Sequence, residues 1–250
     1  MKHIVAIGGG EIGRPGFPVE TTAIDQRIVE LTNKNRPNAL FIPTASGDST
    51  SYADIFTKHY GKRLGCTVDT LNLYNSKPTW QEIQEKLAWC DLVYVGGGNT
   101  LKMMMLWRRL GVDKLLAAAH KQGKILSGLS AGTIFWFDAG LSDSRSFTSK
   151  SKQWDYINVH GLNLEDIILC PHFDVEPARQ LALKNSLKGT RKVAIALDNC
   201  AALEIEDDSF RILTSKSGTK GYITKWSNGE YIIEPLVLSD DFLPLAEITN

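Results

Sequence analysis

The chain has 250 residues and a formal net charge of zero, with 43% hydrophobic and 22% charged residues. This composition is typical of a globular protein with a packed core, and the balanced charge argues against nucleic acid as a partner. No apolar run approaches the roughly 18 residues that a membrane span needs, and no signal peptide precedes the first apolar run, so we expect a cytoplasmic protein that does not bind membranes.

The first half of the chain alternates short apolar runs with longer segments of helical periodicity. This alternation predicts parallel strands that helices cover on both faces. The predicted strands are residues 3–7, 39–44, 67–73, 92–95 and 124–126. The predicted helices are residues 21–33, 52–64, 80–88, 102–109 and 112–122.

The second half has fewer helical segments. Residues 167–170 and 193–197 predict buried strands, with a helix at 177–186 between them. Asn228-Gly229 predicts a hairpin turn among short antiparallel strands. Those strands are expected at residues 201–205, 210–214, 221–226 and 230–233. Residues 138–160 are polar and poorly periodic, which predicts a long loop with a functional role.

These elements predict an α/β fold with a mainly parallel sheet and antiparallel C-terminal strands. No linker rich in proline, glycine or serine interrupts residues 1–250, which are therefore expected to form a single domain. The cysteines have no C-x-x-C spacing, which argues against a structural zinc site and favours a reducing compartment. They are Cys66, Cys90, Cys170 and Cys200.

The pentapeptide Gly128-Leu129-Ser130-Ala131-Gly132 lies between a predicted strand and a predicted helix that starts near residue 133. A serine with glycine two residues before and two after it, on such a turn, is the pattern of a nucleophile elbow. The glycines are needed because a Cβ at either position would collide with the strand or the helix. An ordinary glycine-rich turn between strand and helix is the alternative interpretation.

A serine hydroxyl needs a base to act as a nucleophile at neutral pH. His172 is the best candidate because it stands at the end of a predicted strand, where ligands of parallel sheets bind. His160 in the predicted loop is a further candidate. We expect His3 to be exposed or structural, and His59 and His120, which have charged neighbours on helices, to be solvated.

The base usually needs an orienting partner on its second ring nitrogen. Asp198 and Asn199 follow the next predicted strand, and their side chains should point in opposite directions, so that only one of them faces His172. Asp143, in the predicted loop after Ser130, is a third candidate.

An oxyanion hole needs two backbone donors. The turn places the N–H of Ala131, and Gly97 or Gly98 offers the second donor, since a missing side chain allows close approach. Both Gly96-Gly97-Gly98 and Gly8-Gly9-Gly10 follow predicted strands and could alternatively cradle a phosphate. Neither run has the G-x-G-x-x-G spacing or a P-loop lysine, so nucleotide binding is disfavoured.

Three motifs in order resemble the peptidase E/cyanophycinase family of serine peptidases: residues 96–100 (Gly-Gly-Gly-Asn-Thr), 128–132 and 171–174 (Pro-His-Phe-Asp). The N-terminal Ile-Gly-Gly-Gly and residues 42–46 also fit, so the resemblance covers roughly residues 1–205. It implies a three-layer sandwich similar to class I glutamine amidotransferases, with serine in place of the usual cysteine nucleophile.

The resemblance implies that Ser130 is the nucleophile and His172 the base, with Gly98 and Ala131 in the oxyanion hole. Cyanophycinase-like enzymes have Asp-Glu where this chain has Asp198-Asn199, so Asn199 falls on the third member of the triad. An amide can still hold the imidazole, although it stabilises an imidazolium less than a carboxylate does. In peptidase E an aspartate downstream of the serine has been assigned this role, and Asp143 is its nearest counterpart.

The expected function is therefore hydrolysis of small peptides through an acyl-enzyme, without a metal or cofactor. Peptidase E releases N-terminal aspartate and cyanophycinase cuts β-linked Asp-Arg units, so peptides that contain aspartate are the implied substrates. Arg179 could bind a substrate carboxylate, or it could be an ordinary surface arginine. The expected partner is a small peptide, and a homodimer is an open alternative for the assembly state.

Three other functions are compatible with parts of the sequence. A peptide-binding homologue without catalysis would explain Asn199. An amidotransferase-like enzyme is disfavoured because the residue on the turn is serine. An esterase of the α/β-hydrolase type would need its acid upstream of His172, with Asp143 as the candidate.

Overall fold

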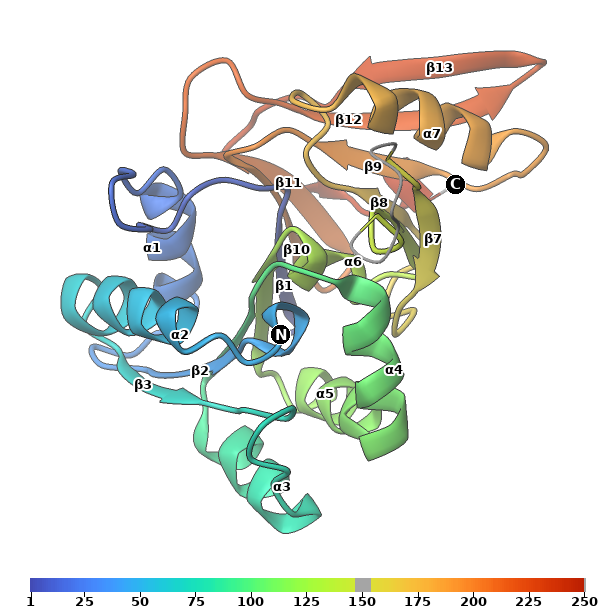
Figure 1. Ribbon diagram of the computed structural model, residues 1–250. Helices are drawn as coiled ribbons and strands as arrows, with labels where there is room; N and C mark the ends of the chain where they lie inside the picture. The colour runs from blue at the N-terminus through green and yellow to red at the C-terminus, as the bar shows by residue number, and fades with distance from the viewer. Residues whose placement is uncertain (147–153, 250) are drawn as a thin grey trace.

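The computed structural model describes residues 1–146 and 154–249, which form two β-sheets with helices packed around them (Figure 1). The first sheet has the strand order β14-β11-β10-β1-β5-β4-β2-β3. Its strands are β1 (His3–Ile7), β2 (Asn38–Ile42), β3 (Thr67–Thr70), β4 (Leu92–Val95), β5 (Ile125–Leu129), β10 (Ala201–Glu206), β11 (Ser209–Thr214) and β14 (Leu243–Pro244). Strands β3, β2, β4, β5 and β1 pair in parallel, and β10, β11 and β14 continue the sheet in antiparallel pairs.

The second sheet has the order β13-β12-β9-β8-β6-β7. Its strands are β6 (Ala139–Ser142), β7 (Ile157–His160), β8 (Ile168–Cys170), β9 (Ala194–Leu197), β12 (Gly221–Ser227) and β13 (Glu230–Pro235). Strands β6, β8 and β9 pair in parallel, and the other pairs are antiparallel. The turn between β12 and β13 is Asn228-Gly229, both with positive φ, which confirms the predicted hairpin.

Helices cover both faces of the first sheet. The helical elements are α1 (Thr22–Glu30), η1 (Thr44–Ser46), α2 (Thr50–Phe56), η2 (Thr57–Arg63), α3 (Trp80–Trp89), α4 (Thr100–Leu110), α5 (Val112–Lys121), α6 (Ala131–Ile134), α7 (Pro177–Leu187) and α8 (Ala246–Thr249). The first sheet buries one face against α1, α2 and η2, and the other against α3, α4, α5 and the second sheet. Helix α7 covers the outer face of the second sheet. The predicted α/β three-layer sandwich is thus confirmed, with a second sheet beside it (Figure 1).

Residues 138–160 differ from the predicted loop. Strands β6 and β7 lie within this range, and residues 147–153 fall outside the described part of the chain. Each strand has only four residues, which is too short for a period-two pattern to stand out in the sequence. Strand β6 is nonetheless buried throughout, because it pairs with β8 on one side and β7 on the other.

The predicted helix at 52–64 changes type partway. It begins as α2 and continues as the π-helix η2. There two consecutive side chains, His59 and Tyr60, both reach the buried carboxylate of Asp25, at 2.8 Å each. The expectation that His59 is solvated is therefore wrong.

The expectation for His120 is wrong too, because this side chain is buried beside the start of β1. His3 is also buried. The sequence analysis left two alternatives for it, an exposed or a structural histidine, and the exposed alternative is wrong. Among the residues that the structure describes, no helix is both long and apolar enough to span a membrane.

Candidate active site

Ser130 stands at the tight turn between β5 and α6, with φ 57° and ψ −116°. A positive φ is rare for a residue with a side chain and marks a strained turn. The conformation is held from two sides: Ser130 N donates to the carbonyl of Ile7 at 3.0 Å, and its own carbonyl accepts from Thr133 Oγ1 at 2.7 Å.

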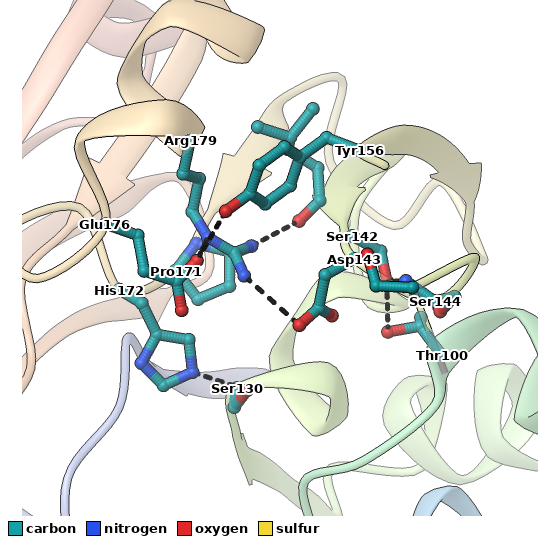
Figure 2. Close-up of polar contacts among 12 residues, drawn as sticks. Thr100, Ser130, Ser142, Asp143, Ser144, Tyr156, Pro171, His172, Glu176 and Arg179 are labelled. Carbon is teal, nitrogen blue, oxygen red and sulfur yellow. Dashed lines mark hydrogen bonds and ion pairs between the residues drawn. The ribbon is translucent and has the colours of Figure 1, made fainter. Parts of the chain in front are cut away.

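The flanking glycines leave room for this turn. A Cβ on Gly128 would lie 2.0 Å from the carbonyl oxygen of Gly132, and a Cβ on Gly132 would lie 2.0 Å from the carbonyl oxygen of Val95. The backbones of β4, β5 and α6 are therefore packed at a distance that only glycine permits. As a result, the turn holds Ser130 where β5 ends, facing the second sheet (Figure 2).

His172 approaches Ser130 from the second sheet, two residues after β8. Its Nε2 lies 2.7 Å from Ser130 Oγ, and its Nδ1 lies 2.7 Å from Asn199 Oδ1. Because the amide oxygen of Asn199 only accepts, Nδ1 carries the proton and Nε2 accepts from the hydroxyl. This is the tautomer that a general base for Ser130 requires.

The pKa of His172 is lowered from its ordinary value. Burial is the main cause; the hydrogen bond to Asn199 opposes it, and the positive charge of Arg179 lowers the pKa further. The carboxylates of Glu176 and Asp143 act in the opposite direction. The imidazole is therefore neutral at neutral pH and free to accept a proton.

The three candidates for the orienting partner lie in different places. Asn199, two residues beyond β9, contacts His172, and its backbone N–H donates to Asp174 Oδ1 at 2.9 Å. Asp198 points away and accepts from the N–H of Lys220 at 2.9 Å, and burial raises its pKa. Asp143 has a carboxylate oxygen 3.8 Å from Arg179 Nη2. Asp174 is the last residue of the Pro-His-Phe-Asp motif. Its position in that motif was the available signal that it holds Asn199 in place, a role that the sequence reasoning missed.

The segment after β1 joins the two sheets at this point. Three successive carbonyls, those of Ile7, Gly8 and Gly9, accept from the N–H groups of Ser130 (3.0 Å), His172 (3.1 Å) and Cys200 (2.9 Å). The sequence indicates only that this glycine run follows a strand, and no pattern in it predicts this backbone role. His172 and Asn199 also follow strands of a different sheet from Ser130, and the segment after β1 brings them together.

Gly9 has no space for a side chain. A Cβ there would lie 1.9 Å from Asn199 Oδ1 and 2.5 Å from His172 Nδ1. The glycine backbone therefore packs directly against the pair formed by the imidazole and the amide, and keeps solvent from that side of it.

Near Ser130, the backbone N–H groups of Gly98 and Ala131 make no hydrogen bond within the described residues. The N–H of Gly97, the other candidate donor, is taken by Tyr52 Oη at 3.2 Å. Burial raises the pKa of Tyr52 to about 12, so its hydroxyl stays neutral. Gly98 has φ 141°, and a Cβ there would lie 2.2 Å from the carbonyl oxygen of Ala45, so the position needs glycine.

Arg179 is buried, which excludes the surface arginine of the sequence analysis. Its Nε donates to Glu176 Oε2 at 2.6 Å and its Nη1 to the carbonyl of Leu141 at 3.1 Å. The guanidinium stacks 4.9 Å from the ring centroid of Tyr156, whose hydroxyl donates to the same Glu176 oxygen at 2.9 Å. Figure 2 shows this group beside Ser130 and His172.

Among the residues that the structure describes, one group of side chains could hold a metal ion: the ligand atoms of His3, Glu204 and Glu206 lie within 4.8 Å of one another. The carboxylate of Glu204 is already paired with two cations, Arg27 at 2.9 Å and Arg211 at 2.7 Å. The group lies at the start of β1, whereas the carbonyls that hold Ser130 and His172 follow the end of that strand. It therefore belongs to the structural framework of the first sheet.

Comparisons with known proteins show the family of the chain. The model of peptidase family S51 matches residues 4–213. The uncharacterized peptidase YgaJ of Bacillus subtilis (strain 168) is 34% identical over 240 residues, which cover 94% of this chain and 97% of the relative.

Solved structures show the same fold. A peptidase from an acI-B1 Actinobacterium has a TM-score of 0.72 at 18% identity and covers 98% of this chain and 97% of its own. The Putative Peptidase E Protein of Listeria monocytogenes EGD-e has a TM-score of 0.63 at 23% identity and covers 86% of this chain and 98% of its own.

Proposed function

The chain belongs to peptidase family S51 and is a serine-type peptidase, and we propose that it hydrolyses small peptides through an acyl-enzyme formed on Ser130. The observation that carries the mechanism is the continuous hydrogen-bonded row from Ser130 Oγ through His172 to Asn199 Oδ1, with 2.7 Å at each step. This geometry is the one that nucleophilic catalysis by serine needs.

In the first half of the reaction, Ser130 Oγ attacks the carbonyl carbon of the scissile bond while His172 Nε2 takes the hydroxyl proton. The tetrahedral oxyanion is stabilised by the N–H groups of Gly98 and Ala131. His172 then gives its proton to the leaving nitrogen, the C–N bond breaks, and the first product departs as an amine. The acyl group stays on Ser130 as an ester.

In the second half, His172 takes a proton from a water molecule, and the resulting hydroxide attacks the ester carbon. The C–O bond to Ser130 breaks, and His172 returns the proton to Oγ. Asn199 keeps the proton of Nδ1 in place throughout, so that Nε2 always faces the reacting atoms. It carries no charge, so the imidazolium gains less stabilisation than a carboxylate would give.

For the substrate, we propose small peptides that contain aspartate, with N-terminal aspartyl peptides as the first class to test. This part rests on the resemblance to peptidase E and cyanophycinase. Nη2 of Arg179 donates no hydrogen bond within the described residues, and it lies 3.8 Å from a carboxylate oxygen of Asp143. It thus keeps donors for a further acceptor.

A fluorophosphonate probe tests the nucleophile directly, since it phosphonylates activated serines. We expect stoichiometric labelling of the wild type and none of Ser130→Ala. A peptide library read by mass spectrometry, run beside the same variant, identifies the scissile bond. Absence of labelling, together with retained binding of peptides, would instead favour the non-catalytic homologue that Asn199 suggests.

A further inference from the structure

Asp143 lies in the cleft beside Ser130, but its carboxylate is left without a close partner. Within the described residues it accepts no hydrogen bond, and its nearest cation, Arg179 Nη2, is 3.8 Å away, beyond hydrogen-bonding distance. The side chain is 20% exposed, so the carboxylate is open to a molecule that enters the cleft.

The neighbours of Asp143 fix its direction. Ser142 and Ser144 are both buried, and their hydroxyls bond to each other at 2.7 Å. Ser142 Oγ also donates to Thr100 Oγ1 at 3.2 Å, and Ser144 Oγ accepts from the N–H of Leu101 at 3.0 Å. Because the residues on either side are tied to the start of α4, the side chain of Asp143 faces the other way, toward Arg179 (Figure 2).

A further hydrogen bond links the residues around Asp143 to Gly98, the candidate oxyanion donor. Asn99 follows Gly98 directly, and its side-chain amide donates to the carbonyl of Ser144 at 3.0 Å. The position of Asp143 relative to Gly98 is therefore set by short hydrogen bonds between buried groups. A recognition site needs this kind of support, because a carboxylate on an unanchored loop would cost entropy to order on binding.

The charges around Asp143 favour a cation. Two carboxylates, Asp143 and Glu176, face one guanidinium, Arg179, which leaves one negative charge. Glu176 is occupied, because its Oε2 accepts from both Arg179 and Tyr156. Asp143 is thus the carboxylate with free acceptor positions, and it lies close enough to His172 to act on the pKa of the imidazole.

From this arrangement we propose that Asp143 binds a positively charged nitrogen of the substrate while the adjoining carbonyl lies at Ser130. The inference rests on the proposed peptidase mechanism and adds a specificity residue to it. A small peptide offers such a nitrogen in its free amino terminus, and an arginine or lysine side chain offers the same chemistry. Asp143 is then a recognition residue and takes no part in proton transfer.

The test compares three peptides that differ in whether, and where, they carry a positive charge. The best peptide from the library screen is assayed with a free and with an acetylated amino terminus, and a third, acetylated peptide carries an arginine beside the scissile bond. We expect the wild type to prefer a cationic peptide at least 10-fold in kcat/KM. Asp143→Asn should lose that preference through a 10- to 100-fold rise in KM, with kcat little changed, because it removes a charge-assisted contact.

Two variants complete the design. Asp143→Glu keeps the charge and should recover part of the preference. Asp155→Asn removes an exposed carboxylate that lies 4.0 Å from Arg145 and does not contact Arg179, and it should behave as the wild type. If Asp143→Asn loses only the preference for the free amino terminus, that amine is the bound nitrogen; if it loses only the preference for the arginine peptide, the guanidinium is. If Asp143→Asn keeps the wild-type preference for both cationic peptides, the proposal is overturned.

Labelling by the fluorophosphonate tests the acyl-enzyme mechanism independently of the recognition role of Asp143. The probe has no cationic group, so Asp143→Asn should react at the wild-type rate once His172 is fully neutral. Its acid limb should lie at slightly lower pH, because the variant removes a carboxylate that raises the pKa of His172. A slower reaction at a pH where His172 is fully neutral would show that Asp143 serves His172 and would overturn its recognition role. Failure of the wild type to react would instead remove the proposed acyl-enzyme.

Discussion

Asn199 Oδ1 accepts the Nδ1 proton of His172 at 2.7 Å, so the imidazole is oriented by an amide rather than by a carboxylate. The contact selects the tautomer without placing a negative charge behind the ring. Orientation and charge stabilisation, which a carboxylate supplies together, are thus separate in this site.

Replacing Asn199 should separate these two effects. Asn199→Ala removes the acceptor and should lower kcat/KM about 100-fold, because the imidazole loses its fixed tautomer. Asn199→Asp keeps the acceptor and adds charge, which should raise the pKa of His172 and shift the acid limb of the pH profile upward. Asp198→Asn, one residue away and facing Lys220, is the matched control. Equal activity of Asn199→Ala and the wild type would remove Asn199 from the site.

The pH dependence of activity follows from the lowered pKa of His172. The base works only when neutral, so kcat/KM should rise as pH passes upward through this pKa. Since burial moves the pKa below its usual value of about 6.5, the acid limb should have its midpoint below that value. Rates between pH 4 and 8 with a non-ionising substrate measure it, and a midpoint above 7 would contradict the assignment.

Gly9→Ala tests the packing against the imidazole and amide. The new Cβ would lie 1.9 Å from Asn199 Oδ1, so the pair must move, and we expect kcat/KM to fall at least 100-fold. Gly61→Ala is the control, because its Cβ would meet Val68 Cγ2 at 3.4 Å, an ordinary contact. Circular dichroism verifies that both variants fold. A fully active Gly9→Ala would show that this contact is unimportant.

Acid sensitivity of the fold should depend in part on His120. Burial lowers its pKa to about 4, below the value of about 6.5 in the unfolded chain. The unfolded state therefore binds more protons between these values, and stability is complete above pH 6.5 and falls as pH drops toward 4. Urea unfolding at pH 7 and pH 5 should show a loss on the order of 1 kcal/mol that His120→Gln reduces. The same loss in both proteins would assign the sensitivity to other groups.

Much of the site could be predicted from the sequence. The glycine spacing around Ser130 and the strand end before His172 each carry a local signal, and the structure brings both together with Asn199. The opposite directions of the Asp198 and Asn199 side chains followed from the alternation of side chains along an extended chain. These features depend on residues close together in sequence, where pattern and geometry are directly linked.

Features that depend on distant pairing could not be predicted. Strand β6 is too short to show a period, and Asp143 just beyond it is oriented by the contacts of Ser142 and Ser144 with the start of α4. The burial of Arg179 arises from Leu141, Glu176 and Tyr156, which come from three separate segments. The way in which the two sheets meet likewise depends on the hydrogen bonds of residues 7–9, which leave no mark on hydrophobic periodicity.

The row of carbonyls at Ile7, Gly8 and Gly9 has a consequence for how such an enzyme can diversify. Three consecutive peptide units fix the spacing of three backbone positions that lie about 30 to 40 residues apart in the chain. The chain segments between those positions therefore do not determine the distances between them. Insertions in them would reshape the walls of the cleft, and so the choice of peptide, while the reacting atoms keep their separation.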